Sequence, residues 1–229
     1  QLNAKLMKQR FSFLIRFFLF WLIYFIVFRA VFLVYQLPLT RGISMGDALM
    51  IFTRGIWMDT SLAGYILLLA SLFMALLYFV HGRFIRTVYT TYTIILLVLF
   101  SVITISDLEL YRNWGFRIDA TPLLYLKTPK DAMASLKGWV ILVLAIAAAI
   151  AVISNMFFYR KWVAKPLNHI EKGKWWYFPI FTFIAACMII PIRGGFGIAP
   201  MNPGKVYFSQ NVYCNHAALN PVWNMMYSV

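Results

Sequence analysis

Charged residues are scarce in this chain of 229 residues: only 12% are Asp, Glu, Lys or Arg, whereas soluble domains carry about 25%. Apolar residues make up 62%, and the mean hydropathy is +0.76. This composition excludes a water-soluble globular enzyme, a disordered tail and a disulfide-rich secreted module. There are only two cysteines, Cys187 and Cys214, too few to cross-link a chain of this length, so structural disulfides are not expected.

Acidic residues are the scarcest class of charge. Seven Asp and Glu stand against 21 Lys and Arg, which gives a formal net charge of +14. In a soluble protein such an excess indicates nucleic-acid binding. Here the charges lie around long apolar runs, so we attribute the excess to membrane topology and to attraction for anionic lipids, and we expect no nucleic-acid partner.

Five runs are apolar enough to be membrane helices, which need about 20 such residues. Four of them contain no Asp, Glu, Lys or Arg, and the first carries Arg16 and Arg29. We expect both arginines to snorkel to the two interfaces, and the alternative is a lipid-phosphate or interhelical role. The predicted spans lie at about 11–35, 60–80, 87–106, 138–159 and 175–192. The sequence therefore predicts an all-α membrane protein with five transmembrane helices.

The distribution of charge predicts the orientation of these helices. With the N-terminus inside, the inner segments hold ten basic residues and one acidic residue, and the outer segments hold nine basic and six acidic. The inner basic residues are Lys5, Lys8, Arg10, Arg83, Arg86, Arg160, Lys161, Lys165, Lys172 and Lys174. Basic residues alone are nearly balanced, so the asymmetry rests on the acidic ones. We predict the N-terminus inside and the C-terminus outside.

The segments between the spans predict short interfacial helices and a tail. Residues 46–59 mix apolar and charged side chains, which is typical of an interfacial helix that runs into the second span. Residues 128–131, Thr-Pro-Lys-Asp, have the pattern of a helix start. Residues 193–229 are rich in Gly, Pro and Asn, and we expect an outer linker there. The chain begins at Gln1 rather than Met, which favours a piece of a longer protein.

Catalytic and metal-binding patterns are not found in the sequence. Cys214 and His216 lie two residues apart without further ligands nearby, and no Gly-rich phosphate loop or nucleophile with a matching base is evident. We therefore expect no catalytic residue, metal or cofactor in this chain. Spans two to five carry no ionisable side chain except Cys187 and several tyrosines, which disfavours a proton-coupled pump or ion transporter.

Four residues near the expected outer surface are candidates for a lipid-headgroup site. Arg54 and Asp59 lead into the second span, Arg112 follows the third, and Arg193 ends the fifth. An Arg fork suits a phosphate, and Asp59 would hold one Arg in place. The alternative is scattered interfacial ion pairs, in which Asp59 and Asp107 pair with Arg54, Arg112 or Arg193.

Three segments carry a resemblance to a known family. They are RGIWMDTS with Gly55 and Asp59, ISDLELYRNWGFRID with Asp107, Tyr111 and Arg117, and a tail with Arg193, Gly194, Pro200, Asn215, Asn220 and Pro221. Through them the chain resembles the membrane half of lipoteichoic-acid-synthase-like proteins of the alkaline phosphatase/sulfatase superfamily. The resemblance covers nearly the whole chain.

The resemblance implies a bacterial protein of the cytoplasmic (inner) membrane, with five spans followed by an extracytoplasmic domain. Such relatives transfer phosphoglycerol or phosphoethanolamine from phospholipids, with a Thr or Ser nucleophile and a divalent metal (Mn, Mg or Zn) in that outer domain. The expected partners of this chain are then phospholipids and its own outer domain, and its function is to anchor the transferase and present lipid headgroups. The alternative is a non-catalytic lipid-sensing or regulatory membrane protein of the same architecture.

Overall fold

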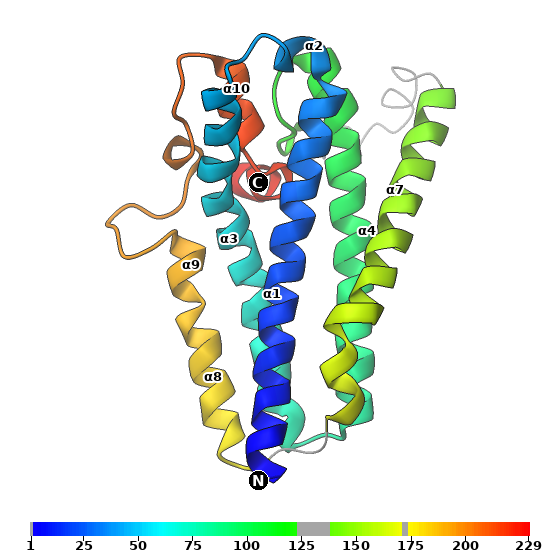
Figure 1. Cartoon of the computed structure of the whole chain (residues 1–229), viewed down its shortest axis with the longest axis vertical. Helices are drawn as coiled ribbons and strands as arrows, with labels where there is room; N and C mark the ends of the chain where they lie inside the picture. The colour runs from blue at the N-terminus through cyan, green and yellow to red at the C-terminus, as the bar shows by residue number, and fades with distance from the viewer. Residues whose placement is uncertain (1, 123–137, 171–173) are drawn as a thin grey trace. The chain divides into compact units, whose positions relative to one another are not determined.

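The computed structural model describes residues 2–122, 138–170 and 174–229, and every regular element within them is helical (Figure 1). The longer elements are α1 (Leu2–Tyr35), α3 (Met45–Ala75), α4 (Gly82–Trp114), α7 (Gly138–Phe158) and α8 (Tyr177–Cys187). The shorter α-helices are α2 (Leu37–Thr40), α9 (Ile189–Arg193), α10 (Val212–Ala218) and α11 (Pro221–Ser228). A π-helical turn, Tyr159–Val163, follows α7, and 3-10 turns occupy Leu76–Tyr78, Lys165–His169 and Pro203–Lys205.

Four helical stretches are long and apolar enough to cross a membrane. They are Leu6–Tyr35, Met45–Tyr78, Gly82–Trp114 and Gly138–Val163, and they contain most or all of each of the first four predicted spans. The fifth predicted span corresponds to a shorter apolar helix, Tyr177–Arg193, which combines α8 and α9. The all-helical prediction is confirmed for the described residues. A crossing by the fifth helix and the orientation of the chain stay predictions.

Helix α3 starts earlier than the second predicted span. The Ser44 hydroxyl oxygen accepts a hydrogen bond from the Asp47 amide (3.0 Å) and donates one to the Asp47 carboxylate (2.8 Å), which caps the first turn. The predicted interfacial stretch 46–59 therefore continues without a break into the second span. The helix start predicted at 128–131 lies outside the described residues.

The chain divides into two compact units, and α1, α3, α4 and α7 each contribute residues to both. Unit 1 comprises Gln1–Tyr24, Thr60–Leu96 and Ser154–Met201. Its core is aromatic, with Phe13, Phe17, Tyr89 and Tyr159 fully buried. The ring centroids of Phe13 and Tyr89 are 4.5 Å apart, and those of Phe17 and Tyr159 are 6.3 Å apart in an edge-on arrangement, both within the favourable range for aromatic pairs.

Hydrogen bonds between helices and one close approach of two helices also stabilise unit 1. The Ser61 hydroxyl of α3 donates to the Ile192 carbonyl of α9 (2.7 Å), and a Cβ at Gly64 would lie 3.1 Å from the Ile192 side chain. Arg16 donates to the Trp162 carbonyl (3.0 Å), a carbonyl of the π-helical turn. Arg16 thus has the interhelical contact that was the alternative to snorkelling, and its depth in a membrane stays a prediction.

Unit 2 comprises Phe25–Asp59, Leu97–Ile153 and Asn202–Val229. Its core joins α1, α3, α4 and α10 through Phe32, Ile51, Leu108 and Cys214, all of which are buried. The second part of the tail, expected as a linker, is folded here as α10 and α11. These short helices bury apolar side chains against the rest of the unit, which stabilises them although each is too short to be stable alone.

Local capping explains why the Asn-rich tail becomes helical. The Asn211 carboxamide oxygen accepts from the Tyr213 amide (2.9 Å) at the start of α10, and the Asn220 oxygen accepts from the Trp223 amide (3.1 Å) at the start of α11. Pro221 fills the first helical position of α11, where its missing N–H costs nothing. Asn and Pro, which as a composition indicate a linker, are here N-cap and first-turn residues.

Candidate functional site

A buried ion pair joins α1 to α3 in unit 2. Arg29 is 4% exposed and Asp59 is fully buried. Arg29 donates through both Nη atoms to the two Asp59 oxygens, with Nη2 2.8 Å from Oδ1. A bidentate pair of this kind is the strongest arrangement for these groups. The sequence analysis expected Arg29 to snorkel to the headgroups. Arg29 instead pairs with Asp59, because this acidic partner lies beside it.

Two further residues shape the surroundings of this pair. Gly55 lies one turn before Asp59 in α3, and a Cβ at Gly55 would be 2.4 Å from Arg29 Cζ, so only glycine leaves room for the guanidinium. Asn220 donates through Nδ2 to Asp59 Oδ1 (2.9 Å) while its own oxygen caps α11. Arg29 also donates to the Ala218 carbonyl at the end of α10 (3.3 Å). The ion pair thus fastens the tail to two long helices.

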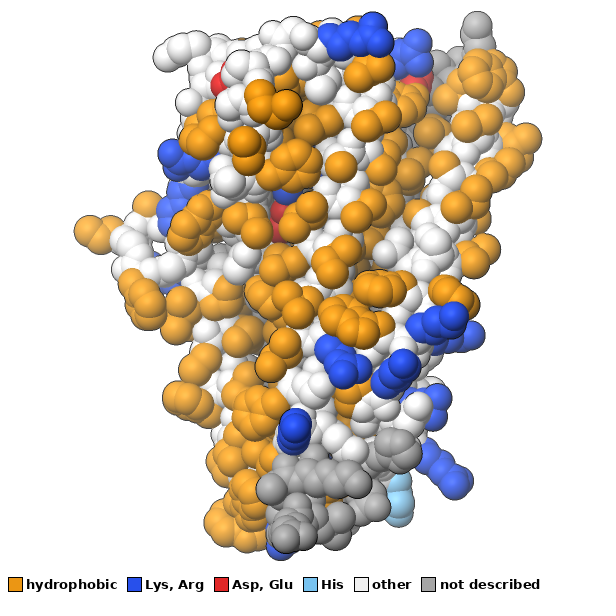
Figure 2. Space-filling view, in the orientation of Figure 1, with side chains coloured by type: hydrophobic (Ala, Val, Ile, Leu, Met, Phe, Trp, Pro, Cys, Tyr) orange, Lys and Arg blue, Asp and Glu red, His pale blue; other side chains and the backbone are white. Residues whose placement is uncertain are grey.

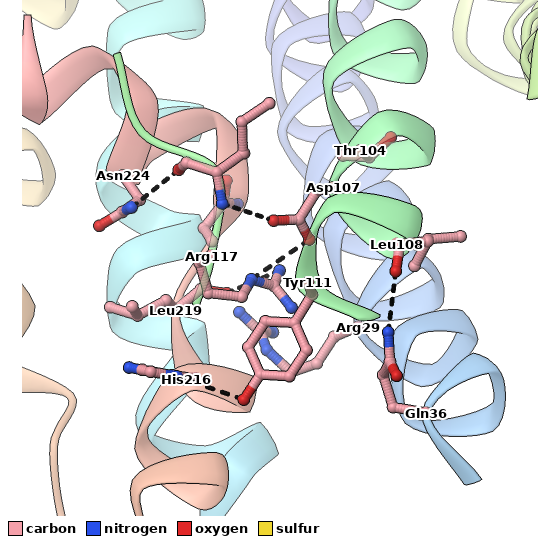
Figure 3. A network of polar contacts seen from close by, with 12 residues as sticks. Arg29, Gln36, Thr104, Asp107, Leu108, Tyr111, Arg117, His216, Leu219 and Asn224 are labelled. Atoms are coloured by element: carbon pink, nitrogen blue, oxygen red, sulfur yellow. Dashed lines mark hydrogen bonds and ion pairs between the residues drawn. The ribbon is translucent and has the colours of Figure 1, made fainter. Parts of the chain in front are cut away.

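A second buried ion pair lies at the end of α4 (Figure 3). Arg117 Nε is 3.3 Å from Asp107 Oδ2, and both side chains are at most 5% exposed. The Asp107 Oδ1 atom accepts from the Ile118 amide (2.8 Å), and Arg117 donates to the Leu219 carbonyl (3.3 Å). The Arg117 guanidinium also lies 3.9 Å from the centre of the Phe32 ring, a cation–π contact.

The turn after α4 makes the second pair possible. Gly115 has a φ of 75°, and its amide donates to the Tyr111 carbonyl (2.8 Å), which ends the helix and turns the chain back on itself. The Tyr111 hydroxyl is 3.2 Å from His216 Nδ1 of α10. Burial lowers the pKa of His216, and the nearby charge of Arg117 lowers this pKa further, so the imidazole is neutral at pH 7.

The two pairs border one small cavity of about 10 Å³, enough for about one water molecule. Arg29, Asp107, Arg117 and Asn220 line it, together with apolar side chains such as Phe25. Within the described residues, Arg29 Nε, Arg117 Nη1 and Asp107 Oδ2 have no hydrogen-bond partner. Two guanidinium groups face two carboxylates, so the cluster is electrically balanced and has no surplus charge to attract an anion. Its geometry is that of a structural clamp.

Comparison with family models, curated proteins and solved structures finds no match to this chain. The site must therefore be judged from its own geometry. Among the described residues, no three His, Cys, Asp or Glu side chains come together as they would to hold a metal ion.

The predicted headgroup residues have different surroundings. Asp59 is buried and bound to Arg29, whereas Arg54 and Arg112 are exposed. Arg193 belongs to unit 1, is exposed and donates to the Ile198 carbonyl (3.3 Å). Asp59 thus pairs with Arg29, and not with any of the three arginines that the sequence suggested.

The sequence interpretation missed the basic partner in each of the two pairs, Arg29 and Arg117, although a signal was present. Arg29 interrupts one apolar helix and Asp59 lies well inside another, 14 residues after the start of α3. Opposite charges buried in two neighbouring membrane helices are expected to pair, because each is costly alone. Asp107 and Arg117 are ten residues apart and bracket a glycine turn, which is a local signal for the second pair.

Proposed function

We propose that this chain is the membrane anchor of a sulfatase-like phospholipid-headgroup transferase in a bacterial inner membrane. In this proposal, residues 202–229 connect the helices to an extracytoplasmic domain of the kind that the family resemblance implies. The headgroup transferred is phosphoglycerol or phosphoethanolamine, and the nucleophile and divalent metal belong to that outer domain. This chain supplies attachment and access to lipid.

One observation supports the proposal above all others. The residues that carry the resemblance lie far apart in the sequence, yet many of them converge in unit 2. Asp59 binds Asn220, Gly55 makes room for the partner of Asp59, and Asp107 binds Arg117. Unrelated short matches would not be expected to meet in one buried cluster.

The clamp also suits an anchor mechanically. The hydrogen bonds of Arg29 to Ala218, of Arg117 to Leu219 and of Asn220 to Asp59 hold the α10–α11 junction at three points. A domain attached after α11 would then keep a fixed distance from the lipid surface. Arg54 and Arg112 are exposed, and their positive charges would attract lipid phosphates and so present the headgroups.

The test uses the complete gene product that contains this chain, reconstituted in vesicles of phosphatidylglycerol and phosphatidylethanolamine. We expect release of diacylglycerol that stops when EDTA removes the metal and returns with Mn²⁺, Mg²⁺ or Zn²⁺. A following domain that lacks a Thr or Ser nucleophile and Asp/Glu/His ligands would favour the lipid-sensing alternative. A gene product with no extracytoplasmic domain would refute the anchor proposal.

A further inference from the structure

A groove of about 450 Å³ lies in unit 1, and all of the residues that line it belong to that unit. One wall is the first part of α4, where Arg86, Thr87, Thr90 and Thr91 line the groove. The Thr87 and Thr90 hydroxyls donate to the carbonyls four residues before them, at 3.3 and 2.9 Å. Their oxygens keep lone pairs that can accept further hydrogen bonds, while Arg86 supplies a donor fork.

The opposite wall is formed by Tyr159, Arg160 and Asn168, from the end of α7 onward. The chain widens here into the π-helical turn Tyr159–Val163, a feature that is often found at functional sites. Tyr159 is fully buried, and its hydroxyl lies near the Thr90 and Thr93 hydroxyls without forming a hydrogen bond of normal geometry. The groove therefore offers two guanidinium groups, an amide and several hydroxyls.

The charge in this unit is of one sign. Apart from Glu171, which lies outside the described residues, the segments of unit 1 contain no acidic residue. Arg86 and Arg160 thus have no carboxylate partner among the described residues of their unit, unlike the balanced arginines of unit 2. Figure 2 shows Lys and Arg side chains gathered over the C-terminal end of α7. A groove with two unneutralised guanidinium groups favours an anion with several oxygen acceptors.

Exposed apolar side chains continue the walls of the groove along both helices. Ile94 and Ile95 follow Thr90 and Thr91 by four residues, which puts them on the same faces of α4, and they are 37% and 58% exposed. On α7, Phe157 is 59% exposed and precedes Tyr159 by two residues. An amphiphile could place its polar end in the groove and its chains on these apolar faces.

We propose that this groove binds the phosphate of an anionic phospholipid with a hydroxylated headgroup, such as phosphatidylglycerol. Arg86 and Arg160 hold the phosphate oxygens, the threonine oxygens accept from the headgroup hydroxyls, and the acyl chains lie along Ile94, Ile95 and Phe157. Basic pockets between membrane helices are known to select anionic lipid headgroups. This inference does not depend on the proposed transferase function.

The experiment measures lipid binding to the whole chain by native mass spectrometry in detergent. Each charge-assisted hydrogen bond lost should weaken binding by about tenfold or more. Arg86→Gln/Arg160→Gln should therefore weaken retention of phosphatidylglycerol by about a hundredfold. Arg83→Gln/Lys165→Gln is the matched control, since it removes the same charge from exposed residues that do not line the groove. We expect phosphatidylglycerol binding to the control variant to weaken by no more than about fivefold, which is the effect of general charge attraction.

Two further arms make the outcome decisive. Thr91→Phe keeps the charge and fills the groove, so it should weaken the binding of phosphatidylglycerol as the double variant does. It tests the site even if the double variant fails to fold. Glycerol phosphate and inorganic phosphate distinguish a lipid from a free anion, and both should bind at least tenfold more weakly than phosphatidylglycerol. Equal loss in the control variant would overturn the site. Equally tight binding of inorganic phosphate would overturn the lipid assignment.

Discussion

Asp59→Asn removes one charge from a buried ion pair and keeps the shape of the side chain. Arg29 then has an amide oxygen where it had a carboxylate, and its positive charge stays buried without compensation. Breaking a buried pair in this way typically costs about 3–5 kcal/mol. Asp59 also binds Asn220, and Arg29 binds the Ala218 carbonyl. We therefore expect the lost stability to weaken the attachment of α10 and α11 first.

A natural probe reports on this attachment. Cys214 in α10 is fully buried, so a maleimide reagent reaches it only when the tail opens. In a Cys187→Ala background, Cys214 is the single thiol of the chain. A loss of 3–5 kcal/mol should accelerate labelling by about 150- to 5000-fold if the tail recloses faster than it is labelled.

The comparison needs two further variants. Glu109→Gln removes a carboxylate from the same unit outside the clamp, and it should change the labelling rate by less than threefold, in line with an exposed contact worth at most about 1 kcal/mol. Arg29→Met/Asp59→Leu replaces both charges with apolar groups and should recover most of the lost stability, since no unpaired charge is left buried. The reasoning fails if the single change labels no faster than Glu109→Gln, or if the double change labels as fast as the single one.

Three other predictions concern the packing, the pH dependence and the orientation. Gly55→Ala should accelerate Cys214 labelling as Asp59→Asn does, because its Cβ would stand 2.4 Å from the guanidinium carbon of α1, whereas Gly46→Ala, with its nearest contact at 3.6 Å, should not. Because burial lowers the pKa of His216, the unfolded chain binds a proton on this imidazole at a higher pH than the folded chain does. The free energy of unfolding, measured by denaturant titration, should therefore fall as the pH drops below about 6.5, and this fall should vanish in His216→Gln. With the predicted topology, an impermeant thiol reagent should label Gln210→Cys from outside and Lys165→Cys only from inside, and the opposite pattern would reverse the orientation.

The long helices could be predicted from the sequence because their signal is local. A run such as 138–159 has no alternative to burial in an apolar environment, so its length alone indicates a spanning helix. The join between residues 46–59 and the second span was predicted for the same reason, since helical propensity and apolar pattern continue across it. The limits of the fifth helix were harder to foresee, since Pro191 and the break between α8 and α9 shorten its regular part.

The clamp could not be predicted from the sequence in the same way. Arg29 and Asp59 are 30 residues apart, and whether they meet depends on the rotation of two helices about their axes, which apolar runs of this kind do not specify. Each side chain alone is equally compatible with snorkelling. The two helices of the tail were not foreseen because its composition outweighed two capping signals, Asn211 and the Asn220–Pro221 pair, that favour short helices.

The Arg29–Asp59 pair has a consequence for how the chain enters a membrane. During synthesis α1 emerges before α3, carrying an arginine whose insertion without a partner costs at most about 2.5–3.5 kcal/mol, the value for the centre of a membrane helix. The neutralising carboxylate is made only 30 residues later, in α3. Helix α1 would then wait at the insertion machinery, or remain loosely inserted, until α3 arrives and the two helices enter the lipid with this buried pair already neutralised. A nascent chain that ends before Asp59 should be held in this unfinished state, while one extended past it should be released.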